Sequence, residues 1–242
     1  VYAFRARGFH PDEPFFDTME EMADTYVEAM QKIQPHGPYY LTGYSYGGVV
    51  AFEVAKRLQA QGEQIHFCGV LNVPPHIKPR MHEIKYCDGL TNLMLFVELL
   101  TKDQVLEINE TMMGKPNEEV LAVALEMSNK KRLEELQLTA EKLNHWVMLA
   151  ASLIDVGRKY DPSGVLKTLT LFYAIPLRGT KQEWVQGPLA EWNEFAELPI
   201  EYIEVPGHHY TLMSPQYVDQ FIRIYKAAMD RTAARAIASY AQ

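Results

Sequence analysis

The chain has 242 residues, of which 48% are hydrophobic, and its formal net charge at pH 7 is −8. This length is sufficient for one large domain with a single buried core. An acidic surface repels phosphate backbones, so nucleic acid is not an expected partner. The sequence has no run of 18 apolar residues, and we therefore expect no membrane span.

The two cysteines, Cys68 and Cys87, form neither a disulfide framework nor a CxxC motif. Cys68 lies in an apolar run and is predicted to be a small core residue. This cysteine usage indicates a reducing compartment, and we expect a cytoplasmic protein. The histidine, cysteine and acidic residues follow no zinc or calcium spacing, so no metal site is expected.

The first third of the chain alternates between strand and helix patterns. Apolar residues recur at helical spacing in residues 17–34, and either Asp17 with Glu20 or Thr18 with Glu21 can cap this helix. A continuous apolar run at residues 65–73 is typical of a strand buried on both faces. The predicted elements are a strand at 1–4, a helix at 17–34, a strand at 39–42, a helix at 49–61 and a strand at 65–73. This order predicts an α/β fold with a mostly parallel sheet and helices on both of its faces.

The middle of the chain, at about residues 85–160, interrupts this alternation with helical apolar stripes and little strand character. Strand patterns resume at residues 169–175 and 200–205, each ended by a proline. Residues 217–229 form a last amphipathic helix, which the alanine-rich tail can extend. We therefore predict one domain over residues 1–242, with a helical insertion at about 85–160 over one edge of the sheet.

The sequence Gly43-x-Ser45-x-Gly47 lies between a predicted strand and a predicted helix. A serine nucleophile needs this context, because the tight turn lifts its hydroxyl above the carboxyl edge of the sheet. We expect the two glycines to let the backbone pass without a clash. The N–H of Tyr46 then lies at a helix start, where it can bind an oxyanion.

A serine hydroxyl also needs a base and, in this fold, an acid that follows it and precedes a histidine in the chain. His209 is the predicted base, because it follows the strand at 200–205 and no histidine lies beyond it. We expect the adjacent His208 to be a neighbour. The end of the strand at 65–73 carries Asn72 instead of an acid, and Glu183 is the nearest carboxylate after the next strand. Either the amide occupies the acid position, by nature or by engineering, and limits the rate, or the acid comes from another segment.

Two segments resemble the thioesterase domains at the ends of nonribosomal peptide and polyketide synthetases. They are YYLTGYSYGGVVAFEVAKRL around Ser45 and PGHHYTLMSPQYV around His209. RARGF near the start also matches, and NVPPHIK is similar to the thioesterases of short adenylation–carrier–thioesterase synthetases. Those synthetases join two arylpyruvate units into quinones or furanones.

The resemblance implies an α/β-hydrolase fold in which the insertion is a helical lid over an acyl pocket. It implies that a carrier domain of the same synthetase delivers an aromatic or acyl substrate on its 4′-phosphopantetheine arm, with no cofactor bound directly. The family's acid stands about where Asn72 stands here. Family members also start with earlier strands, whose loop donates the second oxyanion N–H, so we expect upstream residues before Val1.

The resemblance favours an enzyme that takes the acyl group onto Ser45 and releases it by condensation, cyclisation or hydrolysis. Two other readings stay open. One is a free-standing esterase or lipase of the same fold, which would not require a carrier protein. The other is a catalytically impaired hydrolase-fold scaffold, for which Asn72 is the support; a fluorophosphonate probe would not label it.

Overall fold

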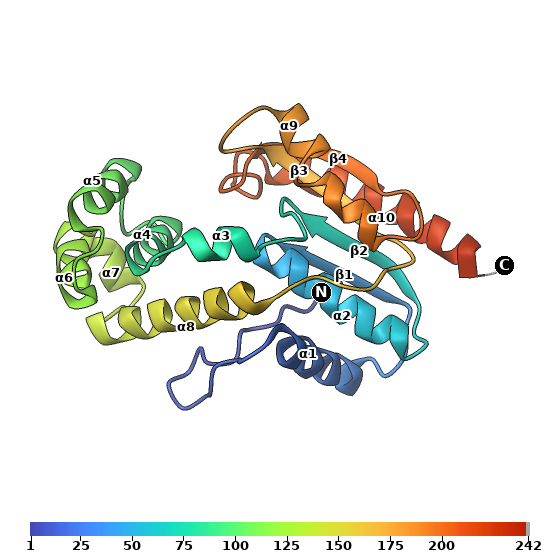
Figure 1. The fold of residues 1–242 in the computed structure, drawn as a ribbon, viewed down its shortest axis with the longest axis horizontal. Coiled ribbons are helices and arrows are strands. Elements are labelled where there is room, and N and C mark those ends of the chain that lie inside the picture. The colour runs from blue at the N-terminus through green and yellow to red at the C-terminus, as the bar shows by residue number, and fades with distance from the viewer. Residues whose placement is uncertain (241–242) are drawn as a thin grey trace. The chain divides into compact units, whose positions relative to one another are not determined.

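The computed structural model describes residues 1–240 and divides into two compact units (Figure 1). The first, which we call the helical unit, consists of Val1–Asp17 and Lys78–Lys159. The second, the sheet unit, consists of Thr18–Ile77 and the chain from Tyr160 onward. The predicted functional residues Ser45, Asn72 and His209 all belong to the sheet unit.

The sheet unit is built on four strands within residues 1–240. They are β1 (Tyr39–Tyr44), β2 (Ile65–Leu71), β3 (Thr170–Ile175) and β4 (Glu201–His208). Their order in the sheet is β1-β2-β3-β4, and each neighbouring pair is parallel. Carboxyl ends of parallel strands meet at one edge, so the residues that follow β1, β2 and β4 are brought together there.

Helices cover both faces of this sheet, which confirms the predicted α/β fold (Figure 1). They are α1 (Met19–Ile33), α2 (Tyr46–Ala60), α9 (Lys181–Gln186), the 3-10 helix η1 (Ala190–Phe195) and α10 (Val218–Tyr240). Alternate residues of a strand point to opposite faces. Accordingly, the ring of Phe67 of β2 packs against that of Tyr225 of α10, with the centroids 5.5 Å apart, whereas Val70 of β2 approaches Gly48 of α2.

Most predicted elements are present, with shifted ends. Thr18, and not Asp17, is the N-cap of α1, because its side chain accepts from the N–H of Glu21. Helix α2 begins three residues earlier than expected, directly after Ser45, and α10 continues through the alanine-rich tail to Tyr240. The strand predicted at residues 1–4 is wrong: this segment has no regular secondary structure and pairs with no strand of the sheet among residues 1–240.

The expectation that proline ends the strand at 200–205 is also wrong, because β4 continues through Pro206 to His208. Proline cannot donate a ladder hydrogen bond and is tolerated at sheet edges or irregular pairings. Both conditions hold here, since β4 is the last strand in the described sheet order and its register with β3 shifts between Tyr173 and Ile175. The strand therefore carries the chain to the residue before His209.

The helical unit contains the interrupting segment. Its helices are α3 (Lys78–Glu83), α4 (Tyr86–Phe96), α5 (Lys102–Met112), α6 (Asn117–Met127), α7 (Lys130–Glu135) and α8 (Ala140–Lys159). They enclose a core of their own that includes Leu90, Met94, Ile108 and Leu143. Helical structure thus begins at Lys78, before the expected boundary, while the lid role stays a prediction.

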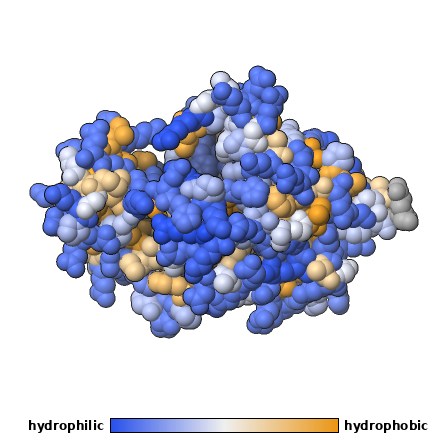
Figure 2. Space-filling view, viewed as in Figure 1, coloured by the Kyte–Doolittle hydropathy of each residue, from blue (hydrophilic) through white to orange (hydrophobic). Residues whose placement is uncertain are grey.

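The face of the molecule drawn in Figure 2 is mostly hydrophilic, with small apolar groups scattered over it. None of the helices within residues 1–240 has the length and hydropathy required to cross a bilayer. Both cysteines are buried and unpaired, and burial raises the pKa of the Cys68 thiol to about 12. Cys68 is therefore the small core residue that the sequence predicted.

Candidate active site

Ser45 occupies the turn between β1 and α2, at the carboxyl edge of the sheet. Its backbone has φ of 53° and ψ of −130°, a conformation that a non-glycine residue rarely adopts. The N–H of Ser45 donates to the carbonyl of Leu71 at 2.9 Å, which ties the turn to the end of β2. Such strain persists only where the surrounding structure over-determines it, and it concentrates at functional sites.

The glycines around Ser45 have different roles. A Cβ on Gly43 would lie 1.8 Å from the carbonyl oxygen of Gly47, so only glycine fits at position 43. A Cβ on Gly47 would meet nothing within 4 Å, which corrects the expectation that both motif glycines are needed to avoid a clash. Gly48, which sequence reasoning passed over, is close-packed instead, because a Cβ there would lie 2.9 Å from Cγ1 of Val73. The sequence feature that could have indicated this close packing is the pair of adjacent glycines, Gly47 and Gly48, at the start of α2.

Tyr46 is the first residue of α2. The N–H groups of a first helical turn have no intrahelical acceptor and lie at the positive end of the helix dipole. No acidic side chain occupies the first turn of α2. The predicted oxyanion donor therefore stands where backbone geometry suits an anion.

His209 follows the last residue of β4 in a tight turn. Gly207 has φ of 80°, in the left-handed region, and the N–H groups of Thr211 and Leu212 donate to the carbonyl of His208 at 2.8 and 3.0 Å. The Nδ1 atom of His208 accepts from the N–H of Tyr210 at 3.3 Å. The ring of His208 is thus used inside the turn, as a neighbour of the predicted base.

Asn72 follows the last residue of β2 and is buried, with 4% of its surface exposed. Its φ of 56° lies in the left-handed region, which asparagine and aspartate tolerate better than other residues with a side chain. Its Nδ2 atom lies 3.0 Å from Nδ1 of His209. Sequence positions 72 and 209 therefore meet at hydrogen-bond distance at the carboxyl edge of the sheet.

The orientation of the Asn72 amide is set by two further contacts. Its Oδ1 atom accepts from the backbone N–H of Ala174 at 3.2 Å and from the indole N–H of Trp184 at 3.1 Å. Both partners can only donate, so the oxygen must face them and the NH₂ group must face His209. The amide therefore donates to Nδ1, and the ring proton of neutral His209 is placed on Nε2.

Sequence reasoning missed Trp184, since nothing in its local pattern connects it with residue 72. Glu183 beside it was the alternative acid, but its carboxylate accepts from the N–H and hydroxyl of Thr180, at 2.8 and 2.9 Å. These hydrogen bonds cap α9 and lower the pKa of the Glu183 carboxyl. Of these two alternatives, Asn72 has the side chain at hydrogen-bond distance from the His209 ring, at 3.0 Å.

Tyr44, the residue before Ser45, also contacts the predicted base. Its hydroxyl donates to the main-chain carbonyl of His209, and the two ring centroids are 5.0 Å apart. Burial raises the pKa of Tyr44 to about 12, and the nearby Tyr210 adds to this effect. The phenol is therefore a protonated donor at neutral pH.

Residues 1–229 match the family model described as the thioesterase domain. The chain belongs to the thioesterase domain family. The match includes the Ser45 turn, the helical segment at about residues 85–160 and the His209 turn. It confirms the family resemblance and the enzyme class that the two sequence segments indicated.

The curated relatives of this thioesterase domain are synthetases. It is 48% identical over 229 residues to an atromentin synthetase of Tapinella panuoides. A protein named inactive atromentin synthetase invA4, from Paxillus involutus, is 41% identical over the same length. In both cases the match covers 95% of this chain and 24% of the relative, so the chain spans about a quarter of the length of these proteins.

Solved structures support the fold. The Vlm2 thioesterase domain bound to a dodecadepsipeptide superposes with a TM-score of 0.64, covering 91% of this chain and 78% of that one. Its sequence is 19% identical. At this level of identity the likeness concerns the fold alone, and it agrees with the α/β-hydrolase architecture of the sheet unit.

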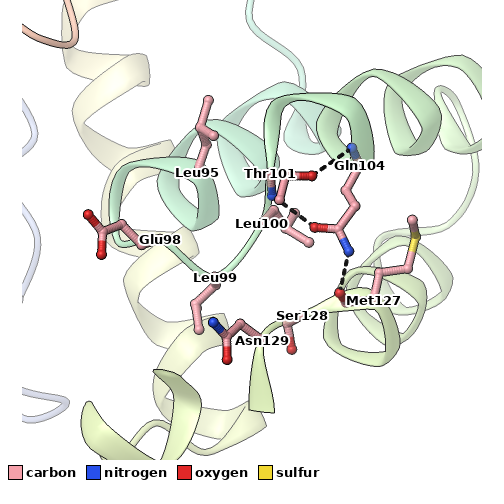
Figure 3. Close-up of a pocket in the computed structure, with 9 residues that line it drawn as sticks. All are labelled: Leu95, Glu98, Leu99, Leu100, Thr101, Gln104, Met127, Ser128 and Asn129. Atoms are coloured by element: carbon pink, nitrogen blue, oxygen red, sulfur yellow. Dashed lines mark hydrogen bonds between the residues drawn. The ribbon is translucent and has the colours of Figure 1, made fainter. Parts of the chain in front are cut away.

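The helical unit of the thioesterase domain holds a pocket of about 440 Å³ (Figure 3). Its lining includes Gln104, whose side chain accepts from the N–H of Thr101 at 2.8 Å and donates to the carbonyl of Met127 at 2.7 Å. These polar groups satisfy one another, and none of the predicted catalytic residues lines the pocket. Within residues 1–240, no three histidine, cysteine or acidic side chains form a metal-binding group.

Proposed function

We propose that this thioesterase domain accepts an acyl group on Ser45 and belongs to an adenylation–carrier–thioesterase synthetase of the atromentin type. A carrier domain of the same synthetase delivers the acyl group on its 4′-phosphopantetheine arm, in the cytoplasm, with no role for nucleic acid or a membrane. The identity with named atromentin synthetases over 95% of the chain supports this assignment. The observation that carries it is the strained Ser45 turn at the sheet edge where Asn72 contacts His209.

The first chemical step is transfer of the acyl group from sulfur to oxygen. The Ser45 hydroxyl attacks the thioester carbonyl while His209, in the less favoured tautomer that carries its ring proton on Nδ1, takes the hydroxyl proton on Nε2. The N–H of Tyr46 stabilises the oxyanion of the tetrahedral intermediate. The C–S bond then breaks, the proton passes from His209 to the leaving thiolate, and an ester of Ser45 remains.

The second step releases the acyl group and returns Ser45 to its free form. For an arylpyruvate substrate, His209 removes a proton from the α-carbon of a second unit, and this carbon attacks the ester carbonyl. A C–C bond forms, the bond to the Ser45 oxygen breaks, and His209 returns the proton to that oxygen. Cyclisation by an internal hydroxyl or amine, or hydrolysis by water, follows the same sequence with another nucleophile.

The test is to identify the acylated residue in the intact chain. After treatment with an arylpyruvyl pantetheine thioester, mass spectrometry should locate the adduct on Ser45. Ser45→Ala should abolish it, while Ser239→Ala, which removes a helix-surface hydroxyl bonded to Ala236, should not. An adduct on any other residue would refute the assignment of Ser45.

One observation favours a second candidate, a catalytically impaired domain that serves as a scaffold. The amide of Asn72 donates to His209, where a base needs an acceptor. A relative named as inactive is 41% identical. A fluorophosphonate probe separates the two candidates, because a dead site would leave Ser45 unlabelled.

The probe would not distinguish a free-standing esterase, because Ser45 of such an enzyme would be labelled equally well. A free-standing esterase would instead be recognised by activity on esters without any carrier domain.

A further inference from the structure

Tyr44 connects two functional segments that are far apart in the sequence. It is the last residue of β1 and directly precedes Ser45, and its hydroxyl donates to the carbonyl of His209, 165 residues away. In the sheet it stands beside Leu71, the residue before Asn72. One side chain thus links the strand that carries the nucleophile to the turn that carries the base.

The turn of His209 cannot make this link with its own backbone. The N–H groups of Thr211 and Leu212 both donate to the carbonyl of His208, which leaves the next carbonyl along the chain for the phenol. A peptide carbonyl held by a protonated phenol is fixed close to the Cα atom of His209. The position of the His209 Cα atom, from which the imidazole side chain extends, is therefore fixed relative to the end of β1.

The ring of Tyr44 adds a second restraint. It lies against the His209 imidazole with the ring planes tilted by 35°, while Tyr210 approaches the same imidazole edge-on at 5.3 Å. Tyr44 itself packs against the apolar cluster of β2, β3 and α10, which includes Leu71 and Phe172. A rigid, partly buried ring on a strand holds its neighbour more precisely than a loop side chain can.

We propose that Tyr44 is a positioning residue that holds His209 at the distance and angle required for proton transfer with Ser45. The proposal rests on the proposed function, since it assigns His209 as the base. Proton transfer depends steeply on geometry, and a misplacement of about 1 Å can lower a rate by about 10². Removal of the hydroxyl should therefore lower the rate of acylation without changing substrate affinity.

The test compares Tyr44→Phe with Tyr40→Phe in the intact chain. Tyr40 lies on the same strand, and its hydroxyl lies 3.4 Å from Nδ1 of another histidine, His66, so the control removes a matched Tyr–His contact. Single-turnover acylation by an arylpyruvyl pantetheine thioester is measured against thioester concentration. Tyr44→Phe should lower the maximal rate by about 10- to 100-fold with an unchanged half-saturating concentration, and Tyr40→Phe should leave both values at parental levels.

Two measurements that do not require activity accompany it. In Tyr44→Phe the ring ¹⁵N signals of His209 should broaden, because the imidazole samples more than one position. Amide exchange at Thr211 and Leu212 should accelerate, while exchange in β2 stays the same, which also shows that the variant is folded. Neither change should occur in Tyr40→Phe.

Parental acylation by Tyr44→Phe, or an equal loss in both variants, would overturn the proposal. If the parent chain forms no adduct on Ser45, the proposed function fails instead. The ¹⁵N signals and amide exchange then still decide whether Tyr44 holds the turn: unchanged values in Tyr44→Phe overturn its positioning role.

Discussion

Replacement of Asn72 by aspartate should activate Ser45. The side chain of residue 72 faces the backbone N–H of Ala174, the indole N–H of Trp184 and Nδ1 of His209. A carboxylate can accept from all three, with one oxygen taking the first two donors and the other taking a proton on Nδ1. The ring proton then moves from Nε2 to Nδ1, and the lone pair on Nε2 can accept the proton of Ser45.

The size of the expected rate increase can be calculated from the hydrogen bonds of the Asn72 amide. Turning the Asn72 amide over would leave one buried donor, the N–H of Ala174, and one partly buried donor, the indole N–H of Trp184, facing an NH₂ group, at a cost of about 2–3 kcal/mol. Placing a proton on Nδ1 against the unturned amide costs a similar amount, which corresponds to roughly 10² in rate. Loss of a charge-assisted hydrogen bond to the imidazolium adds about 1.5–3 kcal/mol. The two contributions add to about 3.5–6 kcal/mol, so Asn72→Asp should raise the acylation rate by about 10³–10⁴, in line with the roughly 10⁴-fold loss when a serine protease undergoes the reverse change.

The assay is single-turnover acylation of Ser45 by an activated acyl thioester, with mass spectrometry to count the adduct. Asn193→Asp serves as the control, because it adds the same charge at an exposed position of η1. The fold should tolerate Asn72→Asp, since aspartate also accepts a φ of 56°. Its thermal unfolding midpoint should therefore stay close to that of the parent.

Two results would refute this reasoning. One is an Asn72→Asp variant that acylates no faster than the parent while remaining folded. The other is a ¹⁵N spectrum of the parent in which Nδ1 of neutral His209 carries the proton, because that tautomer contradicts the amide orientation. In either case Asn72 does not limit the base.

The remaining predictions concern burial. Burial raises the pKa of the Cys68 thiol to about 12, so at pH 8 Cys68 is almost entirely the unreactive thiol. Iodoacetamide should therefore alkylate Cys68 only in denaturant. Alkylation of Cys68 in the native chain would contradict its burial. Tyr160→Phe removes one of the hydrogen bonds to the buried carboxylate of Glu53 and should lower the free energy of unfolding by about 1.5–3 kcal/mol in urea titrations; an unchanged midpoint would show that the bond contributes nothing. If the helical unit is a mobile lid, amides of α5 and α6 should exchange faster than those of the fully buried strand β2, and equal protection would count against it.

Local sequence patterns were sufficient for the fold class and for the candidate nucleophile. Continuous apolar runs and helical periodicity predict β2 and α1 because each element must bury one face or both. The turn at Ser45 was recognisable because Gly43 must approach the backbone of Gly47, a constraint that lies within five residues. Asn72 was found in the same way, from its place at the end of a buried strand.

Local sequence patterns fail to predict where a strand forms or ends when its pairing with other strands determines the outcome. Residues 1–4 have an apolar strand pattern but form no strand, since a strand exists only when another strand pairs with it. The sequence predicts that a strand ends at Pro206, but β4 continues through this residue. An edge strand with irregular pairing loses little stability when proline provides no N–H for a ladder hydrogen bond.

The chemistry of the site depended on contacts across long stretches of chain. The sequence placed Asn72 and His209 at strand ends, but only the folded sheet set Nδ2 and Nδ1 3.0 Å apart across 137 residues. Neither the orientation of the Asn72 amide nor the hydrogen bond from Tyr44 to His209 can be predicted from the sequence around these residues. Each depends on donors and acceptors that converge at the carboxyl edge of the sheet, because parallel strands bring their ends together whatever the length of the chain between them.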